Sequence, residues 1–408
     1  MKLAFFSPLS PQRSGISDYS EELLPLLAQG ADIDLFTDED VTPTNPAIIE
    51  RFSVFPYTQF AERHQAAPYD LCLYQMGNNP KYHHYMDDFI QQYPGIVTLH
   101  DYALQHFYVD IFGKARRFDE YQESMERYYG HQGRIVASYF RRRILQDYVF
   151  YQFPLFQRVV EPSLGTIAHS NYVTHKILRY DASFTIKMIP MGVIPPDLNG
   201  YDKHELRERY HIPQDCFVVG AYGYVSPGKR IPELLRSFAE FARHTPEALC
   251  VLVGHLIGPE ELPTFDMRKL IRELGIEDNV LITGFTPYDQ FFDYIALSDV
   301  CVNLRHPTVR ATSANILKIM AFAKPLLISD LGENLDFPKT SCIKIPLDDS
   351  EEECLLQAFQ KLYQDTECRK NLGDNARTYV EHHHTVEQAA EQYLAFCSNV
   401  LEKKSRSV

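Results

Sequence analysis

Lys229 and Arg230 stand side by side where a predicted buried strand over residues 219–222 gives way to an amphipathic helix predicted from Ile231. In parallel α/β sheets this turn lies at the ligand-binding edge, and a helix N-terminus presents free N–H groups. Two cations there would form a site for a dianionic group such as a diphosphate. The alternative is a pair of solvent-exposed charges, as most surface lysines and arginines are.

Polar residues also follow two predicted strands of the first half. His100-Asp101 ends the strand over 95–99, and Gly77-Asn78-Asn79 follows the strand over 71–74. A histidine at a strand end can position a hydroxyl or stabilise developing positive charge. An isolated histidine is also a common structural hydrogen-bonding residue, and that alternative stays open.

Two helix starts add weaker signals. Gly15 precedes a helix predicted over 19–27 and would allow a ligand to approach the backbone, although Ser17 or Asp18 could be a plain N-cap there. In the second half, Thr312 and Ser313 open a helix predicted over 315–322. They could donate to an anion or act as a capping pair.

The composition excludes some classes of protein and indicates the cellular compartment. The 408 residues have a formal net charge of −14, which argues against a general nucleic-acid-binding or anionic-membrane surface but leaves room for a local basic cleft. The eight cysteines are scattered, so we expect reduced core thiols in a cytoplasmic protein. We expect no signal peptide and no membrane-spanning segment; peripheral contact with the inner face of a membrane stays open.

Strand and helix patterns alternate in two series, which predicts two doubly wound, Rossmann-like α/β domains with a ligand cleft between them. A Pro/Gly-containing segment over 188–196 separates the series, giving domains 1–195 and 196–385, and the C-terminal segment 386–408 follows. The predicted strands are Leu3–Ser7, Ile33–Phe36, Leu71–Tyr74, Gly95–Leu99, Leu164–Ala168, Cys216–Ala221, Leu249–Val253, Val280–Thr283, Val300–Asn303 and Leu326–Ser329.

Residues 103–160 interrupt the first series with helical periodicity, which predicts a helical insertion. Arg141-Arg142-Arg143 lies within it beside apolar residues. A solvated helix face is the favoured interpretation, and contact with an acceptor or a membrane surface is the alternative. The segment 386–401 predicts an amphipathic helix, followed by a frayed tail over 403–408.

Taken in order, these segments resemble one family over nearly the whole chain: retaining, nucleotide-sugar-dependent glycosyltransferases of the GT-B fold, glycosyltransferase family 4. The segments that carry the resemblance are Phe6-Ser7-Pro8, Ser14–Tyr19, Tyr74–Asn78, Leu99-His100-Asp101, Phe153-Pro154-Leu155, His169-Ser170, Gly223–Arg230, Arg305–Thr308, Thr312-Ser313, Ala323–Leu326 and Ser329-Asp330.

The resemblance implies an acceptor-binding first domain, a donor-binding second domain and a last helix that crosses back to the first domain. It implies that Lys229 holds the donor diphosphate with Arg230 beside it, and that His100 lies across the cleft near the transferred sugar. His100 and Lys229 would be the catalytic residues. Donor contacts would come from Gly15, Lys229, Arg230, Gly284, Phe285, Arg310, Thr312, Ser313 and Lys318, and acceptor contacts from Asn78 and Asp101.

The chain departs from the family pattern at three places. Tyr224 stands where an arginine usually precedes the lysine, and Arg310-Ala311 and Lys318 stand where a pair of glutamates usually binds the donor sugar and the ribose. Lysine and alanine side chains cannot accept the hydrogen bonds that carboxylates accept. Glu333 and Asp336 are acidic residues nearby along the chain that could replace them.

Three functions follow from these observations. The favoured one is transfer of a sugar from a nucleotide sugar to an acceptor hydroxyl with retention, as in polysaccharide or glycoconjugate biosynthesis, without a metal or any cofactor beyond the donor. The second is a non-catalytic GT-B protein that binds a partner or a nucleotide, and the third is a nucleotide-sugar epimerase on the same architecture. The sequence does not indicate whether the acceptor is a glycan, a lipid-linked sugar, a small molecule or a protein.

Overall fold

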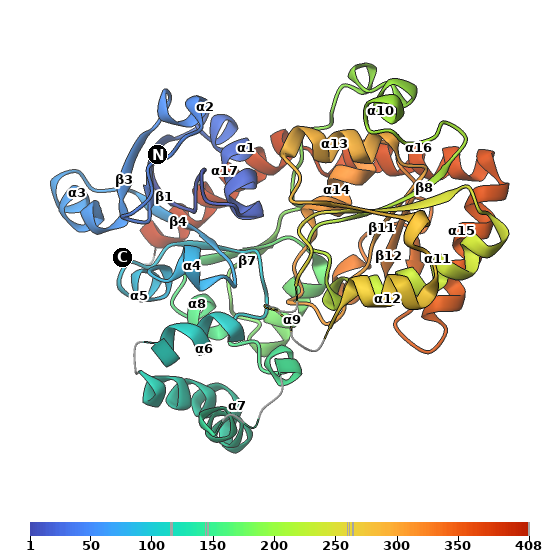
Figure 1. Ribbon diagram of the computed structural model, residues 1–408. Helices are drawn as coiled ribbons and strands as arrows, with labels where there is room; N and C mark the ends of the chain where they lie inside the picture. Colours follow the sequence, from blue (N-terminus) through green and yellow to red (C-terminus); the bar gives the residue numbers. More distant parts are fainter. Residues whose placement is uncertain are drawn as a thin grey trace. The chain divides into compact units, whose positions relative to one another are not determined.

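The computed structural model describes residues 1–114, 117–142, 144, 147–258, 260, 262 and 265–406, which form two compact units (Figure 1). Unit 1 comprises Met1–Gly192, Val309–Thr312 and Val386–Val408, and unit 2 comprises Val193–Thr308 and Ser313–Thr385. Each unit is built around one parallel sheet.

The sheet of unit 1 has the strand order β3-β2-β1-β4-β5-β6-β7, with every pair parallel. The chain first adds strands on one side of β1 and then, from β4 onward, on the other side, so the order of strand addition reverses between β1 and β4. Its strands are β1 (Lys2–Phe6), β2 (Asp32–Thr37), β3 (Ser53–Pro56), β4 (Leu71–Met76), β5 (Ile96–Leu99), β6 (Gly165–Ala168) and β7 (Ile186–Met188).

Helices follow these strands in the usual alternation, because a parallel neighbour can be reached only by a crossover. The C-terminal helix α17 (Val386–Arg406) packs against α1 (Gly15–Leu27) in unit 1. The others are α2 (Pro46–Ile49), α3 (Phe60–Ala66), α4 (Pro80–His83), α5 (Met86–Gln92), α6 (Gln105–Lys114), α7 (Phe118–Arg141), α8 (Gln157–Val160) and α9 (Asn171–Tyr180), with short turns η1 (Tyr57–Gln59) and η2 (Asp147–Tyr151).

The sheet of unit 2 has the order β10-β9-β8-β11-β12-β13, again parallel, and the chain reverses direction between β8 and β11. Its strands are β8 (Phe217–Tyr222), β9 (Ala248–Val253), β10 (Val280–Gly284), β11 (Val300–Asn303), β12 (Leu326–Ser329) and β13 (Ile343–Ile345). Its helices are α10 (Lys203–Arg209), α11 (Ile231–His244), α12 (Met267–Leu274), α13 (Tyr288–Leu297), α14 (Ala314–Ala321), α15 (Glu351–Gln364) and α16 (Thr366–His383), with turns η3 (Leu198–Gly200), η4 (Pro227–Lys229), η5 (Glu277–Asn279) and η6 (Gly332–Asn334).

The two doubly wound domains and the returning C-terminal helix confirm the predicted fold. The sequence predicted the central strands because strands buried on both faces consist mostly of apolar residues. Every residue of β4 and of β8 is buried. The sequence did not indicate β3, β7 or β13, which are all edge strands of only three or four residues.

Two local predictions were wrong. The first helix begins at Gly15, and its N-cap is Ser14, whose hydroxyl accepts from the Ile16 N–H at 3.2 Å, so neither Ser17 nor Asp18 caps it. The C-terminal helix continues to Arg406, so the expected fraying from Lys403 is absent over the described residues of the tail. The expected tail residues 407 and 408 lie outside the described residues.

Candidate functional site

The carboxyl ends of β8 and β11 adjoin at the reversal point of the second sheet, with Ala221 paired to Val302. In doubly wound sheets a ligand crevice opens at this point, because the loops after the two strands diverge in opposite directions. The loop after β8 leaves through Gly223, whose φ of 108° is accessible mainly to glycine. A Cβ at Gly254, after β9, would stand 2.0 Å from the carbonyl oxygen of Gly223, so the two loops pack backbone against backbone.

Lys229 ends the η4 turn, which hydrogen bonds hold over the strand ends. Its backbone N–H donates to the Ser226 carbonyl at 3.1 Å, and the His306 N–H donates to the Gly228 carbonyl at 3.0 Å. The side chain reaches a cavity of about 10 Å³, room for about one water molecule. Burial, together with the charge of Arg305, holds the pKa of Lys229 well below its ordinary value.

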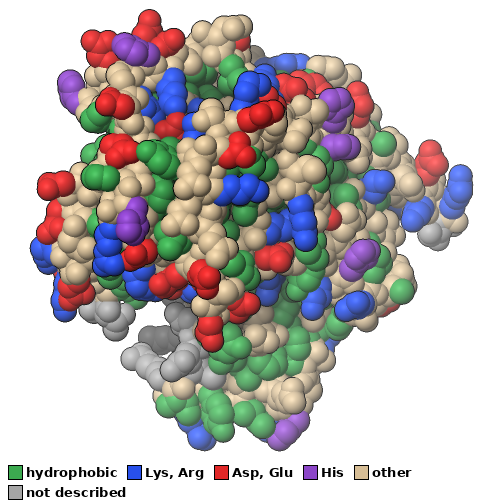
Figure 2. All heavy atoms as spheres, turned by 90° about the vertical axis from the view of Figure 1, so that its right-hand side faces the viewer, with side chains coloured by type: hydrophobic (Ala, Val, Ile, Leu, Met, Phe, Trp, Pro, Cys, Tyr) green, Lys and Arg blue, Asp and Glu red, His purple; other side chains and the backbone are tan. Residues whose placement is uncertain are grey.

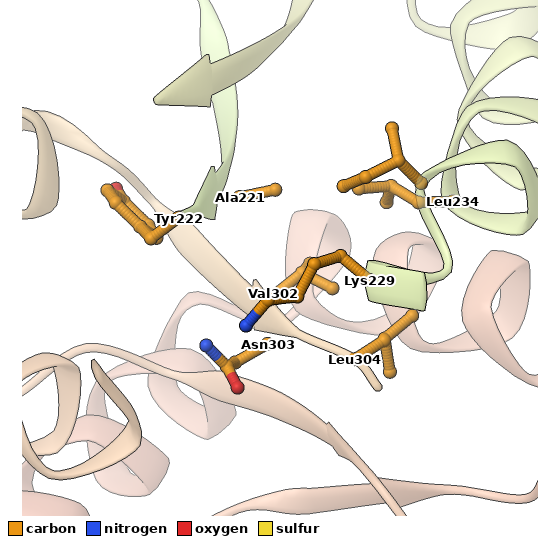
Figure 3. A pocket seen from close by; sticks show the side chains of 8 residues that line it. Ala221, Tyr222, Lys229, Leu234, Val302, Asn303 and Leu304 are labelled. Atoms are coloured by element: carbon orange, nitrogen blue, oxygen red, sulfur yellow. The ribbon is translucent and has the colours of Figure 1, made fainter. Parts of the chain in front are cut away.

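Asn303 presents a second donor to the same space. Its side chain is buried, and Figure 3 shows the amide nitrogen of Asn303 and the ammonium of Lys229 directed toward one another. Arg305 donates to the Ser313 hydroxyl at 2.6 Å, and that hydroxyl donates to Asn303 Oδ1 at 3.4 Å. This chain orients the amide, and within the described part of the protein Nδ2 has no acceptor.

The N-terminus of α14 adds N–H groups to the same strand end. Ser313 occupies the N-cap position, but its hydroxyl is committed to Asn303 and does not cap the helix. The predicted capping role of Ser313 is therefore wrong, and the first-turn N–H groups keep their capacity to bind an anion. The name donor cluster is used below for the hydrogen-bond donors gathered here: Lys229, Asn303, Arg305, Ser313 and the N–H groups of this helix start.

Arg230 lies beside Lys229 in sequence but is engaged elsewhere. It adopts a left-handed backbone conformation with a φ of 56°, and its guanidinium makes ion pairs with Glu351 at the start of α15 and with Glu233. These carboxylates raise the pKa of Arg230 further. The geometry therefore gives Arg230 an anchoring contact for the loop, while its predicted contact with the donor remains a prediction.

Gly284 and Phe285 stand at the end of β10, and Lys318 lies by Tyr288 at the start of the following helix α13. Gly284 ends β10 with a φ of 73°, and the Phe285 side chain is 60% exposed. The ammonium of Lys318 lies 4.4 Å from the ring centre of Tyr288, a cation–π contact. Lys318 thus stands near an exposed aromatic surface at a position where the family pattern has a carboxylate.

Residues 309–312 belong to unit 1, although the chain on both sides belongs to unit 2. The Ala103 N–H donates to the Val309 carbonyl at 3.0 Å, and the Thr312 hydroxyl donates to the His169 carbonyl at 3.3 Å. Between them Arg310 adopts a φ of 61°, which is uncommon for a residue with a side chain, and its guanidinium lies 5.6 Å from the ring centre of Tyr172. Thr312 is therefore not part of the helix start, in contrast to Ser313.

His100 directly follows β5 in unit 1 and is held in one tautomer. Gln75 Nε2 donates to the Thr98 hydroxyl at 3.3 Å, which turns Gln75 Oε1 toward His100 Nε2 at 2.9 Å. His100 Nε2 consequently carries the proton, and Nδ1 is an acceptor. Burial and the neighbouring His169 and His83 hold the pKa of His100 well below its ordinary value, so the ring is neutral.

Two further histidines complete this edge, and His83, His100 and His169 are called the histidine cluster below. The His100 and His169 ring centres are 5.0 Å apart, and His169 Nδ1 donates to the Ile189 carbonyl at 2.9 Å. Burial lowers the pKa of His83 to about 4. His83 and His100 are therefore uncharged at neutral pH.

The other predicted residues of unit 1 are placed at the β1/β4 reversal point. A Cβ at Gly77 would stand 2.4 Å from the end of the Ile16 side chain, so a larger residue there would have to displace that side chain. Asp101 accepts from the Asn78 backbone N–H at 2.7 Å, and Asn78 Oδ1 accepts from the Phe107 N–H at 3.1 Å. Gly15 is exposed with open space before it.

Sequence reasoning missed Gln75, Thr98 and Asn303 as functional candidates. Each is a polar residue inside a strand whose other residues are apolar, and a buried polar side chain needs a partner. That contrast was the available signal. Over the described residues, no group of three metal-ligating side chains could hold an ion, and no helix is long and apolar enough to cross a bilayer.

Comparisons with known proteins agree with this geometry. Residues 202–379, almost all in unit 2, match the family model of glycosyl transferases group 1. The chain is 27% identical over 190 residues to alpha-D-kanosaminyltransferase of Streptomyces kanamyceticus, covering 46% of this chain and 47% of that protein. It is 27% identical over 222 residues to O-antigen chain mannosyltransferase C of Escherichia coli, covering 53% and 56%. These alignments span about half the length of the curated relatives.

The full-length fold has close structural counterparts. HepE of Anabaena, solved in complex with UDP, aligns with a TM-score of 0.68 at 18% sequence identity over 98% of this chain and 100% of that chain. The fold is that of the GT-B glycosyltransferases. At this level of identity the likeness to HepE concerns the fold alone.

Proposed function

We propose that this GT-B protein transfers a sugar from a nucleotide-sugar donor to an acceptor hydroxyl, with retention at the anomeric carbon and without a metal. The observation that carries the proposal is the donor cluster. Lys229 and Asn303 direct two donors into one small space at the reversal point of the second sheet, and Arg305 adds charge beside them.

A diphosphate offers the ligand chemistry for these donors, although the cavity beside Lys229 has room for only about one water-sized group, such as a single phosphate oxygen. Its oxygens are acceptors for the Lys229 ammonium, the Asn303 amide and the first-turn N–H groups of α14. Holding the Lys229 charge near Arg305 away from water is unfavourable, and an anion relieves that cost. The match of residues 202–379 to glycosyl transferases group 1, and the UDP-glucose complex of HepE, support a nucleotide sugar as the source of the diphosphate.

The proposed reaction breaks the bond between the anomeric carbon and the diphosphate oxygen. A bond from the acceptor oxygen to the same face of that carbon forms, and the acceptor proton passes to the departing phosphate oxygen. Negative charge grows on the leaving diphosphate, where Lys229, Asn303 and the α14 N–H groups stabilise it. Because these donors neutralise the leaving group, the proposed mechanism assigns no step to a metal.

His100 is suited to a different task. Its neutral ring, with Nε2–H fixed on Gln75, presents Nδ1 as an acceptor for a substrate hydroxyl. The acceptor is proposed to be a sugar hydroxyl of a growing glycan, with the O-antigen chain mannosyltransferase relative as support. Asn78 and Asp101 would act on the acceptor side by shaping the loop between β4 and α6.

The direct test is turnover with a panel of nucleotide sugars and simple glycosides, with the anomeric configuration of the product read by NMR. Transfer with retention, unchanged by a chelator, supports the proposal. Inversion refutes the retention part, and loss of activity with the chelator refutes the metal-independent part. Interconversion of the donor without an acceptor would instead support the epimerase.

A second candidate, a nucleotide-binding protein without transferase activity, is favoured by the replaced carboxylates. Lys318 faces Tyr288, and Arg310 lies by Tyr172, so neither position supplies an acceptor for sugar or ribose hydroxyls. Buried Glu333, in η6 after β12, is a described carboxylate that could replace them. Tight nucleotide binding with no turnover of any donor would decide for this candidate.

A further inference from the structure

The loop after β8 carries an uncharged side chain, Tyr224, in the stretch before Lys229. Tyr224 is 62% exposed, and its ring lies edge-on to the ring of His255, with 6.0 Å between the ring centres. The backbone of the next residue pairs on the same side, since the Val225 N–H donates to the His255 carbonyl at 2.8 Å. The Tyr224 side chain is therefore directed to the loop after β9, and it brings no positive charge to the donor cluster.

Arg305 reaches the donor cluster from the loop after β11. Its backbone N–H donates to the Ser329 hydroxyl at 2.9 Å, and its guanidinium donates to the Ser313 hydroxyl at 2.6 Å. Both serines are buried. The His306 N–H donates to the Gly228 carbonyl at 3.0 Å, which ties this loop to the η4 turn. Contacts of the backbone and of the side chain thus hold the charge of Arg305 at the strand ends.

The charges of Arg305 and Lys229 act on each other. Burial is the main reason why the pKa of Lys229 lies well below its ordinary value, and the charge of Arg305 lowers it further. Two cations held together away from water repel each other, which costs stability in the absence of an anion. A ligand with two negative charges removes this repulsion, because each cation then has an opposite charge beside it. The arrangement therefore suits a diphosphate better than a neutral sugar.

The position of Arg305 complements the small cavity beside Lys229. That cavity, of about 10 Å³, is lined by Lys229, Asn303 and Leu304 among others, and it has room for one phosphate oxygen. Arg305 directly follows Leu304, so it is placed for oxygens outside the cavity. A guanidinium can bind two phosphate oxygens side by side, whereas an ammonium acts as a point charge. Because Ser313 already orients the guanidinium, little of its freedom is lost on binding.

This concentration of positive charge is local. The whole chain has a formal net charge of −14, and on the face that Figure 2 draws, the basic and acidic side chains of the described residues are intermixed. Groups of like charge brought together in a partly buried place are a mark of functional sites. The pair of Arg305 and Lys229 is therefore an exception to the charge pattern of that face.

We propose that Arg305 binds the donor diphosphate as the second cation beside Lys229, in the place of the arginine that position 224 lacks. The inference rests on the proposed function, since it takes the ligand of the donor cluster to be a nucleoside diphosphate. Arg305 holds phosphate oxygens outside the Lys229 cavity and stabilises the charge that grows on the leaving diphosphate. It thus has a binding role in addition to orienting Asn303 through Ser313.

The test begins with calorimetry of the full chain at pH 8, with UDP, GDP, ADP and inorganic pyrophosphate as probes. Arg305→Gln should raise the dissociation constants of the probes that bind about tenfold to a hundredfold, the loss of one hydrogen bond between charged groups. Arg243→Gln is the matched control, because Arg243 lies in the last turn of α11, about 20 Å along the helix from Lys229. This control should bind like the unchanged protein. Thermal unfolding checks that each variant folds.

Ser313→Ala separates direct binding by Arg305 from its effect on Asn303. It removes the hydroxyl between the two side chains but keeps the guanidinium, so it should weaken binding only about twofold to tenfold. Arg305→Gln should also reduce the proton uptake on nucleotide binding, because the pKa of Lys229 is less depressed without the neighbouring charge. Equal losses of affinity in Ser313→Ala and Arg305→Gln would overturn the proposal, and so would unchanged proton uptake in Arg305→Gln.

The exchange of positions is tested by adding Tyr224→Arg to Arg305→Gln. The neighbouring Gly223 lies close to Lys229, since a Cβ there would stand 3.8 Å from Lys229 Nζ, so an arginine at 224 can reach the same phosphates. We expect the double variant to recover most of the lost affinity, and affinity no better than that of Arg305→Gln would overturn the exchange. If the unchanged protein binds none of the probes, the proposed function fails. If it binds them and Arg305→Gln binds them equally well, only the assignment of Arg305 fails.

Discussion

The two sheet edges of this protein hold their polar residues in opposite electrostatic states. In unit 2 the donor cluster places Lys229 beside Arg305 and Asn303, whose Nδ2 has no acceptor among the described residues, whereas in unit 1 burial lowers the pKa of His83 and His100, and both rings make hydrogen bonds. We propose that an anion completes the first edge. The second presents His100 Nδ1 as an acceptor. We therefore propose that the same architecture serves phosphate at one edge and sugar at the other.

The burial of charge explains why the difference is functional. A desolvated lysine beside an arginine destabilises the folded chain, and such strain persists where a ligand uses it. A neutral histidine on Gln75 carries no such cost. This contrast between the two sheet edges predicts that substitutions in the donor cluster change ligand binding. Substitutions in the histidine cluster should change turnover or the pH dependence of folding stability.

The largest effect is expected for Lys229→Met. Loss of a donor to the leaving diphosphate should lower turnover about 10²–10³-fold and weaken nucleotide binding by about 1.5–3 kcal/mol. The folded-state pKa of Lys229 is depressed, so the unfolded chain binds more protons near neutral pH, and stability should rise with pH until the lysine is neutral in both states. Thermal unfolding of Lys229→Met should therefore occur at a higher temperature than in the wild type. Unchanged affinity with reduced stability would contradict the assignment.

Arg230→Gln should have the opposite profile to Lys229→Met. Removing the partner of buried Glu351 should destabilise the fold by about 3 kcal/mol, since an unpaired carboxylate is left. The dissociation constant for a nucleoside diphosphate should stay unchanged. Arg236→Gln, at an exposed pair with Glu352, is the matched control with little effect on either quantity. A large loss of affinity in Arg230→Gln would instead place Arg230 on the donor.

The neutral state of His83 predicts a pH dependence of stability. Its folded-state pKa of about 4 lies below its ordinary value of 6.5, so the unfolded chain protonates first as the pH falls. The free energy of unfolding should drop between pH 6.5 and pH 4 by up to about 3 kcal/mol. The free energy of unfolding is measured by urea unfolding at each pH and plotted against pH. His83→Gln should remove this part of the slope of that plot, and the exposed His244→Gln should keep it. Identical slopes in both variants would refute a buried neutral His83.

The smallest of these effects should come from His100→Ala. Loss of one hydrogen bond to a substrate hydroxyl should lower kcat about tenfold to a hundredfold with little change in nucleotide affinity. Gln75→Leu removes the hydrogen bond that fixes the tautomer of His100 but keeps the imidazole ring, so it should also lower kcat, by a smaller factor. Thermal unfolding separates this role from a structural one. Equal losses of stability and of turnover in His100→Ala would favour a structural histidine.

Strands buried on both faces, as β4 and β8 are, leave a continuous apolar run that the sequence displays. Edge strands β3, β7 and β13 are short and half-exposed, so their composition does not differ from that of a loop. Lys229 and His100 were visible because each follows a predicted strand. The partner of Arg230 was not, since Glu351 lies 121 positions away and only the tertiary packing of α11 on α15 brings the two together.

The departures at Arg310 and Lys318 show a second limit. The sequence reveals that carboxylates are missing, but the placement of 309–312 in unit 1 depends on hydrogen bonds from Ala103 and to His169. Those contacts join segments that no local pattern connects. Whether Glu333 takes over the role of the missing carboxylates can therefore be tested by measuring the activity of Glu333→Gln with the panel of nucleotide sugars.

The central claim is that the donor cluster binds a diphosphate, and proton linkage tests it most directly. UDP, GDP and ADP are titrated into the wild-type protein by calorimetry at pH 8, in two buffers with different heats of ionisation. An anion against Lys229 raises its depressed pKa, so the account predicts that at least one nucleotide binds with net proton uptake, and that Lys229→Met abolishes the uptake. Failure of all three nucleotides to bind would contradict the account, as would binding with the same proton balance in the wild type and in Lys229→Met.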